Sequence, residues 1–406
     1  MILLLRQNNS YCKLFFSGLI NGIGDRFSQV AMLTMLLTLT GSGLSIGVVM
    51  MLRLLPFLLF APIGGRLSDF FPRKRILVIT DLGRIVFALS FLLVQSQSEI
   101  WIIYLSAFIL AVGEAIYSPA RTSLVPFSVS KENYGKVNSM EQVMTGIVLI
   151  FGALAGGIVT FILGSNIAFW LNGISFLIAA LINATIKNEN KVENISRKLK
   201  GENTYISQIK EVIKNSFPLK LIIIYILLVS LITGIDNILI SIYAVKIFHL
   251  GEFGVGLFYG ALGIGLFCSF YLTSYLRSRF ILTGLLCLGL EGTMLVILSV
   301  NSIVTLAFII FCLTAFFSGT CNTCFNTMLM KNIPEQLRGT LFGVIQAVSN
   351  TLLAISMFFA GILLGYVSPR VLGFLGGVSF VFISIILFIL LISHEYGIRL
   401  RKKLRP

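Results

Sequence analysis

The sequence predicts an all-α membrane protein in which twelve transmembrane helices form two pseudo-symmetric six-helix bundles. Three observations predict this fold. The 406 residues are 57% hydrophobic and only 12% charged, whereas soluble chains carry about 25% charged residues. Apolar runs of about 20 residues, the length that crosses a bilayer, recur almost end to end. The gaps between these runs are alternately basic and nearly uncharged, and the runs lack the polar face of a helix in water.

The twelve predicted spans follow one another through short connections. In chain order they cover residues 12–39, 44–64, 76–94, 101–123, 135–163, 166–186, 218–246, 252–275, 280–300, 303–328, 340–366 and 369–392. A polar segment rich in Lys, Glu, Asn and Ser interrupts the series after the sixth span. We therefore divide the chain into an N-terminal bundle (1–186), a cytoplasmic linker (187–217), a C-terminal bundle (218–392) and a basic cytoplasmic tail (393–406).

The net charge of +15 is mainly a signal of membrane topology. Most of the Lys and Arg residues fall in alternate gaps and at both ends of the chain, and Lys246 and Arg370 are the exceptions on the other side. Basic loops stay in the cytoplasm, so we expect a multi-pass protein of the cell membrane with both termini cytoplasmic. The excess charge then contacts anionic lipid, and we expect no nucleic-acid partner.

The two halves of the sequence resemble each other at equivalent places. Three patterns recur in order: Leu19–Ile23 as Leu231–Ile235, Arg73 and Arg75 as Arg277 and Arg279, and Glu132 and Gly135 as Glu335 and Gly339. Such repeats indicate two bundles related by an axis along the membrane normal, with a substrate site between them near the middle of the membrane.

Residues Gly65–Arg75 directly follow the second predicted span and read Gly-Arg-Leu-Ser-Asp-Phe-Phe-Pro-Arg-Lys-Arg. This stretch resembles the loop 2–3 signature of the major facilitator superfamily, including its first Gly, its Leu, its Asp and its closing basic cluster. Phe70 and Pro72 stand where the signature usually has a basic residue and a second Gly.

Three other stretches support the resemblance. Asp81–Arg84 and Ser118–Arg121 are similar to the bacterial drug:proton antiporter branch that holds macrolide efflux pumps and siderophore exporters. Gly152–Gly157 resembles the antiporter motif of the fifth helix, with Ala153 in place of its Pro. The resemblance implies a twelve-helix exporter driven by the proton gradient, with a cavity lined by helices 1, 4, 7 and 10.

The resemblance also implies a gate. Asp69 would face the start of the eleventh helix, where the helix dipole favours an anion. Together with Gly65, Arg73 and Arg75 it would latch the two halves in one conformational state.

Charged residues within the spans are the candidates for coupling and substrate binding, because each costs a few kcal/mol in the bilayer. Asp25 and Arg26 lie in the first span, Glu114 in the fourth, and Asp236 and Asn237 in the seventh. Burial favours the neutral form of a carboxylate and a nearby Arg favours its charged form. A carboxylate whose surroundings alternate can therefore carry a proton, or it can bind a cationic substrate. The alternative is a static ion pair, such as Arg26 with Glu114.

Other polar residues within the spans have two readings each. Asp81 and Arg84 are three residues apart and can pair on one helix face, so we group them with the gate as a structural pair. Gln142 and Asn322 could bind substrate in the cavity or hydrogen-bond neighbouring helices. Arg53 and Glu291 have no partner that the sequence identifies.

The sequence predicts a transporter and no enzyme. It contains no phosphate-binding loop, and its two His and six Cys residues form no metal or catalytic pattern. We expect a monomer without cofactor or metal that exports a small amphipathic compound, such as an antibiotic or a secondary metabolite, in exchange for protons. The alternatives are a siderophore, lipid or nutrient transporter of other direction, and a receptor that has the transporter fold but moves nothing.

Overall fold

The computed structural model describes residues 2–40, 43–152, 156, 159–160, 162–186 and 210–403, and within these ranges it contains helices and short connections but no strand. The α-helices are α1 (Ile2–Gln7), α2 (Asn9–Thr40), α3 (Gly43–Phe70), α4 (Arg73–Leu89), α5 (Ile100–Leu124), α6 (Tyr134–Ile147), α8 (Ser165–Ala184), α11 (Phe217–Ile242), α12 (Gly251–Tyr275), α13 (Phe280–Val300), α14 (Val304–Asn332), α15 (Arg338–Leu363) and α16 (Pro369–Lys403). Single π-helical turns, η5 (Val148–Gly152) and η7 (Tyr243–Ile247), continue α6 and α11.

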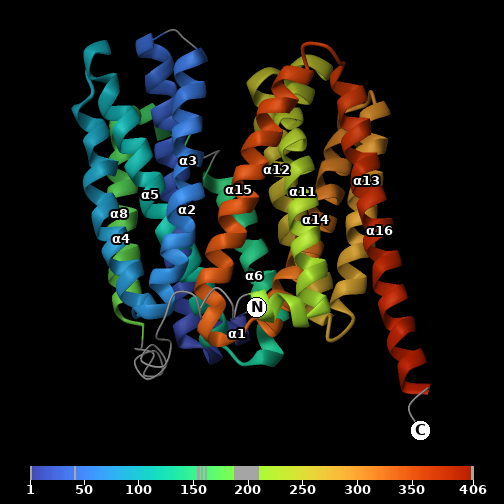
Figure 1. Cartoon of the computed structure of the whole chain (residues 1–406). Helices are drawn as coiled ribbons and strands as arrows, with labels where there is room; N and C mark the ends of the chain where they lie inside the picture. Colours follow the sequence, from blue (N-terminus) through green and yellow to red (C-terminus); the bar gives the residue numbers. More distant parts are fainter. Residues whose placement is uncertain are drawn as a thin grey trace.

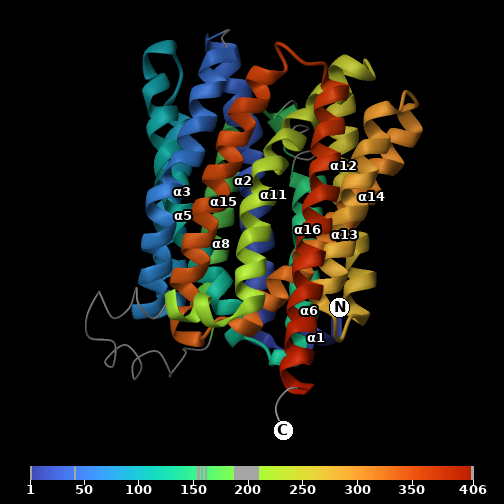
Figure 2. The same cartoon turned by 45° about the vertical axis from the view of Figure 1, so that its right-hand side comes forward.

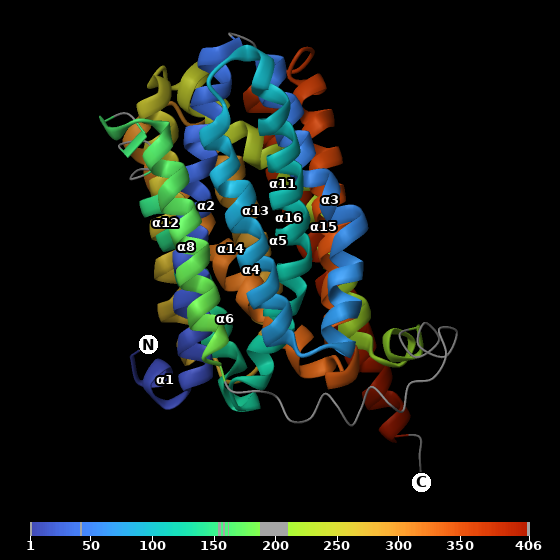
Figure 3. The ribbon, with the colours of Figure 1, turned by 90° about the vertical axis from the view of Figure 1, so that its left-hand side faces the viewer.

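The helices form two bundles that stand side by side (Figure 1). In the N-terminal bundle α2 packs on α8, α3 on α5, and α4 on both α5 and α8, as Figure 3 shows from that side. In the C-terminal bundle α12 and α13 pack on α14, α13 also on α16, and α11 on α15 and α16. The bundles meet where α15 packs on α3 and where α6 packs on α12 and α14, and Figure 2 shows α15 between α3 and α11.

The distribution of polar side chains is that of a protein in lipid. Ten of the described helices are long and apolar enough to cross a membrane. Large apolar side chains such as Ile79 and Phe358 point outward and are about two-thirds exposed, at 68% and 67%. The polar side chains of Asp81 and Asn183 are fully buried. Backbone groups in lipid must be satisfied internally, and the helices meet this requirement.

One end of the molecule carries most of its charged connections, and we call it the basic end. It holds the connections from α3 to α4, from α5 to α6 and from α14 to α15, with Arg66, Lys74, Lys131 and Lys331. Short helix α1 and the last turns of α16 lie at the same end (Figure 1). These segments are the ones that the sequence predicts to be cytoplasmic.

Several helices extend beyond the predicted spans, and α3 and α16 do so by the most at their C-terminal ends. The second predicted span ends at residue 64, but α3 continues to Phe70, so the superfamily signature begins inside a helix. The helix ends there because Phe71 precedes Pro72, and a residue before proline disfavours the helical conformation. Helix α16 continues to Lys403, so most of the predicted tail is helical.

The predicted linker at residues 187–217 is only partly described. Residues 187–209 lie outside the described ranges, and residues 210–215 are helical. Ser216 caps α11, since its hydroxyl accepts a hydrogen bond from the Leu219 amide at 3.4 Å.

Close approach of α13 and α16 depends on two glycines, which gives a test of the fold. A Cβ atom at Gly292 would lie 2.5 Å from the Gly377 carbonyl oxygen, whereas a Cβ atom at Gly260 would meet nothing within 4 Å. We expect Gly292→Ala to destabilise the protein by about 1–3 kcal/mol, because small residues allow helices to pack closely in membranes. Thermal unfolding in detergent measures this, and Gly260→Ala is the matched control. Equal melting temperatures for the two variants would contradict the packing argument.

Candidate functional site

The guanidinium group of Arg84 is the centre of a buried charge cluster in the N-terminal bundle. One of its nitrogens lies 2.7 Å from Asp25 Oδ2 on α2, and another lies 3.0 Å from Glu114 Oε2 on α5. Asp81, one turn earlier on α4, is 4.0 Å away. The ring of Phe176 covers the guanidinium at 4.2 Å. The Arg84 side chain is only 3% exposed, so one buried cation joins carboxylates from three helices.

Asp81 is held mainly by amides. Its two oxygens accept hydrogen bonds from Asn21 Nδ2 at 3.1 Å and Asn183 Nδ2 at 3.0 Å. The predicted pairing of Asp81 with Arg84 is therefore the weakest of the three contacts of Arg84, because Asp25 and Glu114 approach the guanidinium more closely. Both Asp81 and Arg84 lie inside the N-terminal bundle, apart from the gate with which the sequence analysis grouped them.

Arg26 does not form the static pair with Glu114 that the sequence left open. Its side chain is exposed, and its guanidinium donates a hydrogen bond to Gln29 Oε1 at 3.2 Å. The reason is geometric, since consecutive residues of a helix point about 100° apart and do not share a face. Asp25 thus points to Arg84 and its neighbour Arg26 points elsewhere. Glu114 takes Arg84 as its partner instead.

A second ion pair, between Arg121 on α5 and Glu141 on α6, was not predicted. Two guanidinium nitrogens of Arg121 lie 2.7 and 3.2 Å from the Glu141 carboxylate, which also accepts a hydrogen bond from Tyr11 Oη at 3.1 Å. The sequence analysis named Arg121 only as part of the family resemblance, and it selected Gln142 as a cavity residue. Glu141 lines a cavity between the bundles, whereas Gln142 lines none of the three described pockets, because a shift of one residue turns the side chain to another helix face.

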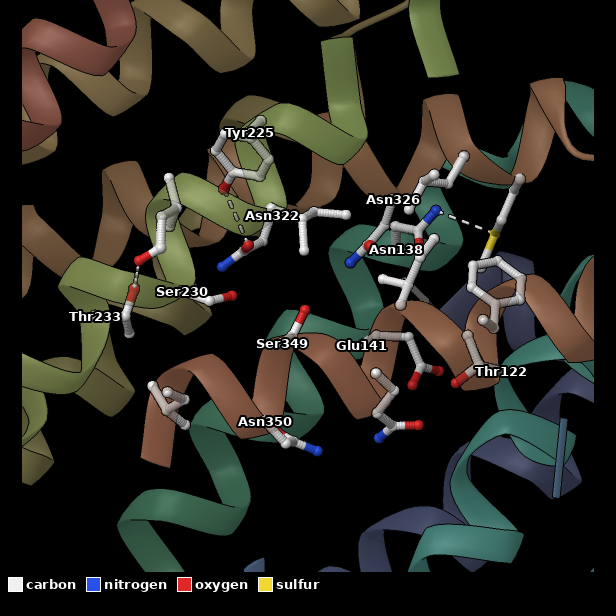
Figure 4. A pocket seen from close by; sticks show the side chains of 18 of the residues that line it. Thr122, Asn138, Glu141, Tyr225, Ser230, Thr233, Asn322, Asn326, Ser349 and Asn350 are labelled. Atoms are coloured by element: carbon white, nitrogen blue, oxygen red, sulfur yellow. Dashed lines mark hydrogen bonds between the residues drawn. The ribbon is translucent and has the colours of Figure 1, made fainter. Parts of the chain in front are cut away.

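A cavity of about 430 Å³ lies between the two bundles. It is bounded by α5 and α6 on one side and by α11, α13, α14 and α15 on the other, and amides and hydroxyls point into it (Figure 4). Asn322, predicted from the sequence, lines this cavity, and its Oδ1 accepts a hydrogen bond from Tyr225 Oη at 3.5 Å. Its other polar lining residues are Arg121, Thr122, Asn138, Glu141, Ser230, Thr233, Glu291, Ser318, Asn326, Gln346, Ser349 and Asn350.

Two smaller pockets adjoin this cavity. One, of about 170 Å³, is lined by the predicted residues Asp236 and Asn237, and it shares Thr233, Glu291 and Ser318 with the central cavity. The sequence analysis gave Glu291 no role, but the fold places it where the two spaces join.

The other pocket lies in the N-terminal bundle and has a volume of about 210 Å³. Asp25 and Glu114 both line it, and Arg121 lines both this pocket and the central cavity. The Arg84 cluster therefore borders open space that leads towards the interface of the bundles.

Asp69 joins the two bundles at the basic end. Its two carboxylate oxygens each accept a backbone hydrogen bond at 2.8 Å, from Gly339 and from Thr340 in the first turn of α15. The free amides and the dipole of a helix N-terminus favour an anion at this position. Arg73 lies 3.9 Å from Asp69, and Gly65 packs against the backbone of Gly339. Gly65 and Asp69 of α3 thus meet Gly339 and Thr340 of α15 directly.

Arg75 is exposed and makes no side-chain hydrogen bond or ion pair among the described residues. The predicted latch therefore contains Gly65, Asp69 and Arg73 but not Arg75, which lies beyond the helix faces that meet. Further hydrogen bonds between the halves lie at or near the basic end instead: Arg338 Nη2 to Tyr134 Oη at 3.3 Å, Asn138 Nδ2 to Thr327 Oγ1 at 3.1 Å, and Gln346 Nε2 to Ser118 Oγ at 2.7 Å. The bundles are thus bonded together on that side of the central cavity.

The predicted antiporter motif at Gly152–Gly157 is only partly described. Residues 153–155 and 157 lie outside the described ranges. Gly152 and Gly156 pack against Arg26 and Phe27 of α2, where an added Cβ atom would be 2.8 and 3.1 Å from the nearest atom.

Comparison with known proteins shows which family has this arrangement. The family model described as Major Facilitator Superfamily matches residues 14–356. The chain belongs to the Major Facilitator Superfamily. This confirms the resemblance seen in the sequence, and it confirms the twelve-helix fold of a transporter that is not an enzyme.

Curated relatives of this superfamily member include efflux proteins. It is 24% identical over 164 residues to macrolide efflux protein A of Streptococcus pyogenes, covering 39% of this chain and 40% of that protein. It is 26% identical over 180 residues to the uncharacterized MFS-type transporter YfiS of Bacillus subtilis, covering 44% and 42%. The alignments therefore span less than half the length of these relatives.

Solved structures of superfamily members share the fold over nearly the whole chain. The human organic anion transporter MFSD10 superposes with a TM-score of 0.79 at 13% identity, covering 93% of this chain and 98% of that one. A bacterial homologue of the iron transporter ferroportin in an outward-facing state gives a TM-score of 0.74 at 18% identity, with the same coverage.

The Arg84 cluster predicts a large effect on stability. Arg84→Gln removes the cation from three carboxylates, and leaving buried charges without a partner costs about 3 kcal/mol or more. We expect a clearly lower melting temperature in detergent. Arg26→Gln is the control, because Arg26 is exposed and, among the described residues, its side chain hydrogen-bonds to Gln29 and forms no ion pair. If both variants unfold at the same temperature, the cluster does not stabilise the bundle.

The Asp69 contact predicts a change in conformation. Asp69→Asn removes the anion from the N-terminus of α15 and should weaken closure of the basic end by about 1–2 kcal/mol. Spin labels at exposed Lys131 and Gln336, which lie on opposite halves, should then show an additional population of molecules with a longer distance between the labels. Glu132→Gln, also exposed at this end, is expected to leave the distances unchanged. If the distances between the labels are unaltered in Asp69→Asn, the Asp69 contact does not hold the basic end closed.

Proposed function

We propose that this protein exports a small amphipathic compound, an antibiotic or a secondary metabolite, in exchange for protons. The observation that carries the proposal is the Arg84 cluster, in which Asp25 and Glu114 share one cation and line a pocket that borders the central cavity. Their side chains are 25% and 37% exposed, so water in the pocket can reach them.

Sharing one cation suits these acids to proton exchange. An arginine beside a carboxylate favours its charged form, and loss of that partner favours the protonated form. When the bundles rock, movement of α2 or α5 against α4 would change which acid Arg84 contacts. One acid would bind a proton in one state and release it in the other. A proton that moves inward across 100 mV supplies about 2.3 kcal/mol.

The central cavity supports a small molecule as the cargo. Its volume of about 430 Å³ is within the range of sites for drug-sized ligands, and its walls mix amides, hydroxyls and apolar side chains. Macrolide efflux protein A of Streptococcus pyogenes is among the relatives, and its name favours export.

The inter-bundle contacts suggest how access would alternate. With the basic end in the cytoplasm of the cell, the Asp69 contact would close the cytoplasmic side of the cavity. The cavity would then open outward, as in the ferroportin homologue of similar fold. Breaking the Asp69 contact would let one bundle rock against the other, within a single monomeric chain.

Export by proton exchange can be tested in cells and vesicles. Accumulation of an antibiotic and dye panel is compared in cells with and without the protein, with and without an uncoupler. We expect Asp25→Asn and Glu114→Gln to reduce uncoupler-sensitive export roughly tenfold or more, because each removes a titratable acid beside Arg84. Glu211→Gln, exposed near the start of α11, should retain it. Normal expression with full export in both acid variants would reject the coupling role.

A further inference from the structure

The pocket lined by Asp236 and Glu291 differs in charge from every other acidic site described above. Asp25, Asp81, Glu114 and Glu141 each lie near an arginine. Asp236 on α11 and Glu291 on α13 form no ion pair within the described residues, and no Lys or Arg lines their pocket. Two carboxylates thus share about 170 Å³ without a protein cation.

Hydrogen-bonding groups in the same pocket also lack partners. Tyr243 is only 2% exposed, yet among the residues that the structure describes its hydroxyl has no hydrogen-bond partner, and one oxygen of Asp236 is likewise buried without one. Gly373 on α16 leaves room beside the Tyr243 hydroxyl, where a Cβ atom would be 2.5 Å away. Buried polar groups are almost always satisfied in proteins. An unsatisfied hydroxyl and carboxylate in one pocket therefore indicate a ligand that donates hydrogen bonds or carries positive charge.

Arg370 lies in the first turn of α16, and its guanidinium already has hydrogen-bond partners. Its guanidinium donates hydrogen bonds to the Ser299 carbonyl at 3.3 Å and to Ser302 Oγ at 3.2 Å, and it does not line the pocket. Arg370 therefore does not neutralise Asp236 or Glu291.

We propose that this pocket binds the protonated or quaternary amine of the transported compound. Asp236 and Glu291 would neutralise the cation, and Tyr243 and Asn237 would orient it. The pocket shares Glu291 with the wall of the central cavity, so the rest of the molecule would lie between the bundles. This assignment rests on the proposed export function and names the chemical class of its substrate.

The walls of the pocket favour an organic cation over a metal ion. Leu262, Leu295 and Phe311 are among its apolar lining residues. No group of three His, Cys, Asp or Glu side chains suited to a metal occurs in the described part of the chain. Divalent cations such as Ca²⁺ require six to eight oxygen ligands, whereas an alkylammonium group suits two carboxylates with apolar surroundings.

Binding of benzyltrimethylammonium to the purified full-length protein tests the proposal. Calorimetry in detergent, without a proton gradient, compares this cation with its neutral isostere neopentylbenzene. We expect Asp236→Asn and Glu291→Gln each to weaken binding of the cation roughly tenfold or more, and to change binding of the isostere little. Glu211→Gln, exposed and outside the described pockets, should leave the Kd of the cation unchanged. Thermal unfolding verifies that each variant is folded, and Tyr243→Phe provides a milder second variant.

Several results would overturn the proposal. They are failure of the wild-type protein to bind the cation, equal affinity for the isostere, and unchanged affinity in both acid variants. Because binding is measured without a gradient, these results leave proton-driven export of another substrate class intact. If cells with the wild-type protein show no export but the purified protein binds the cation normally, the proposed function is rejected and the cation site is retained.

Discussion

The guanidinium of Arg84 holds together the part of the molecule where charge is most costly. A charged side chain within a bilayer costs several kcal/mol unless it is paired, and three carboxylates from α2, α4 and α5 surround this one cation. Asn21 and Asn183 complete the set by donating to Asp81. The N-terminal bundle can therefore contain acids deep in its interior because their charge is partly neutralised and their oxygens are bonded.

The two bundles treat buried acids differently, although they share a fold. The N-terminal bundle pairs its acids with Arg84 and Arg121, whereas Asp236 and Glu291 in the C-terminal bundle have no such partner in the described part of the chain. We infer a division of roles, in which the paired acids exchange protons and the unpaired acids bind a cation. Both sets border the space between the bundles, so a single rocking movement can change the surroundings of both.

Closure at the basic end depends on close backbone approach as well as on charge. Gly65 allows α3 to contact the backbone of α15, and this contact brings the Asp69 carboxylate within reach of two free amides. A helix N-terminus is a good anion site only at short range, because the dipole effect decays within the first turn. The bond is strong when the helices touch and is lost when they separate, which suits a reversible gate.

The sequence by itself determined the fold class, the number of spans and the span in which each candidate charged residue lies. These follow from hydrophobicity, helix rise and the distribution of Lys and Arg, which are local properties of the chain. It also indicated Asp69 and its helix partner, through a motif with a fixed position after the second span.

Only the tertiary structure decided which charges pair. Depth along a helix gives no rotational position, and a step of one residue turns a side chain by about 100°. That step separates Asp25 from Arg26 and Glu141 from Gln142, so Arg84 and Arg121 found partners that the sequence did not identify. Asp236 and Glu291 face one pocket from two helices that are far apart in the chain. This arrangement depends on how α11 and α13 pack together around the pocket.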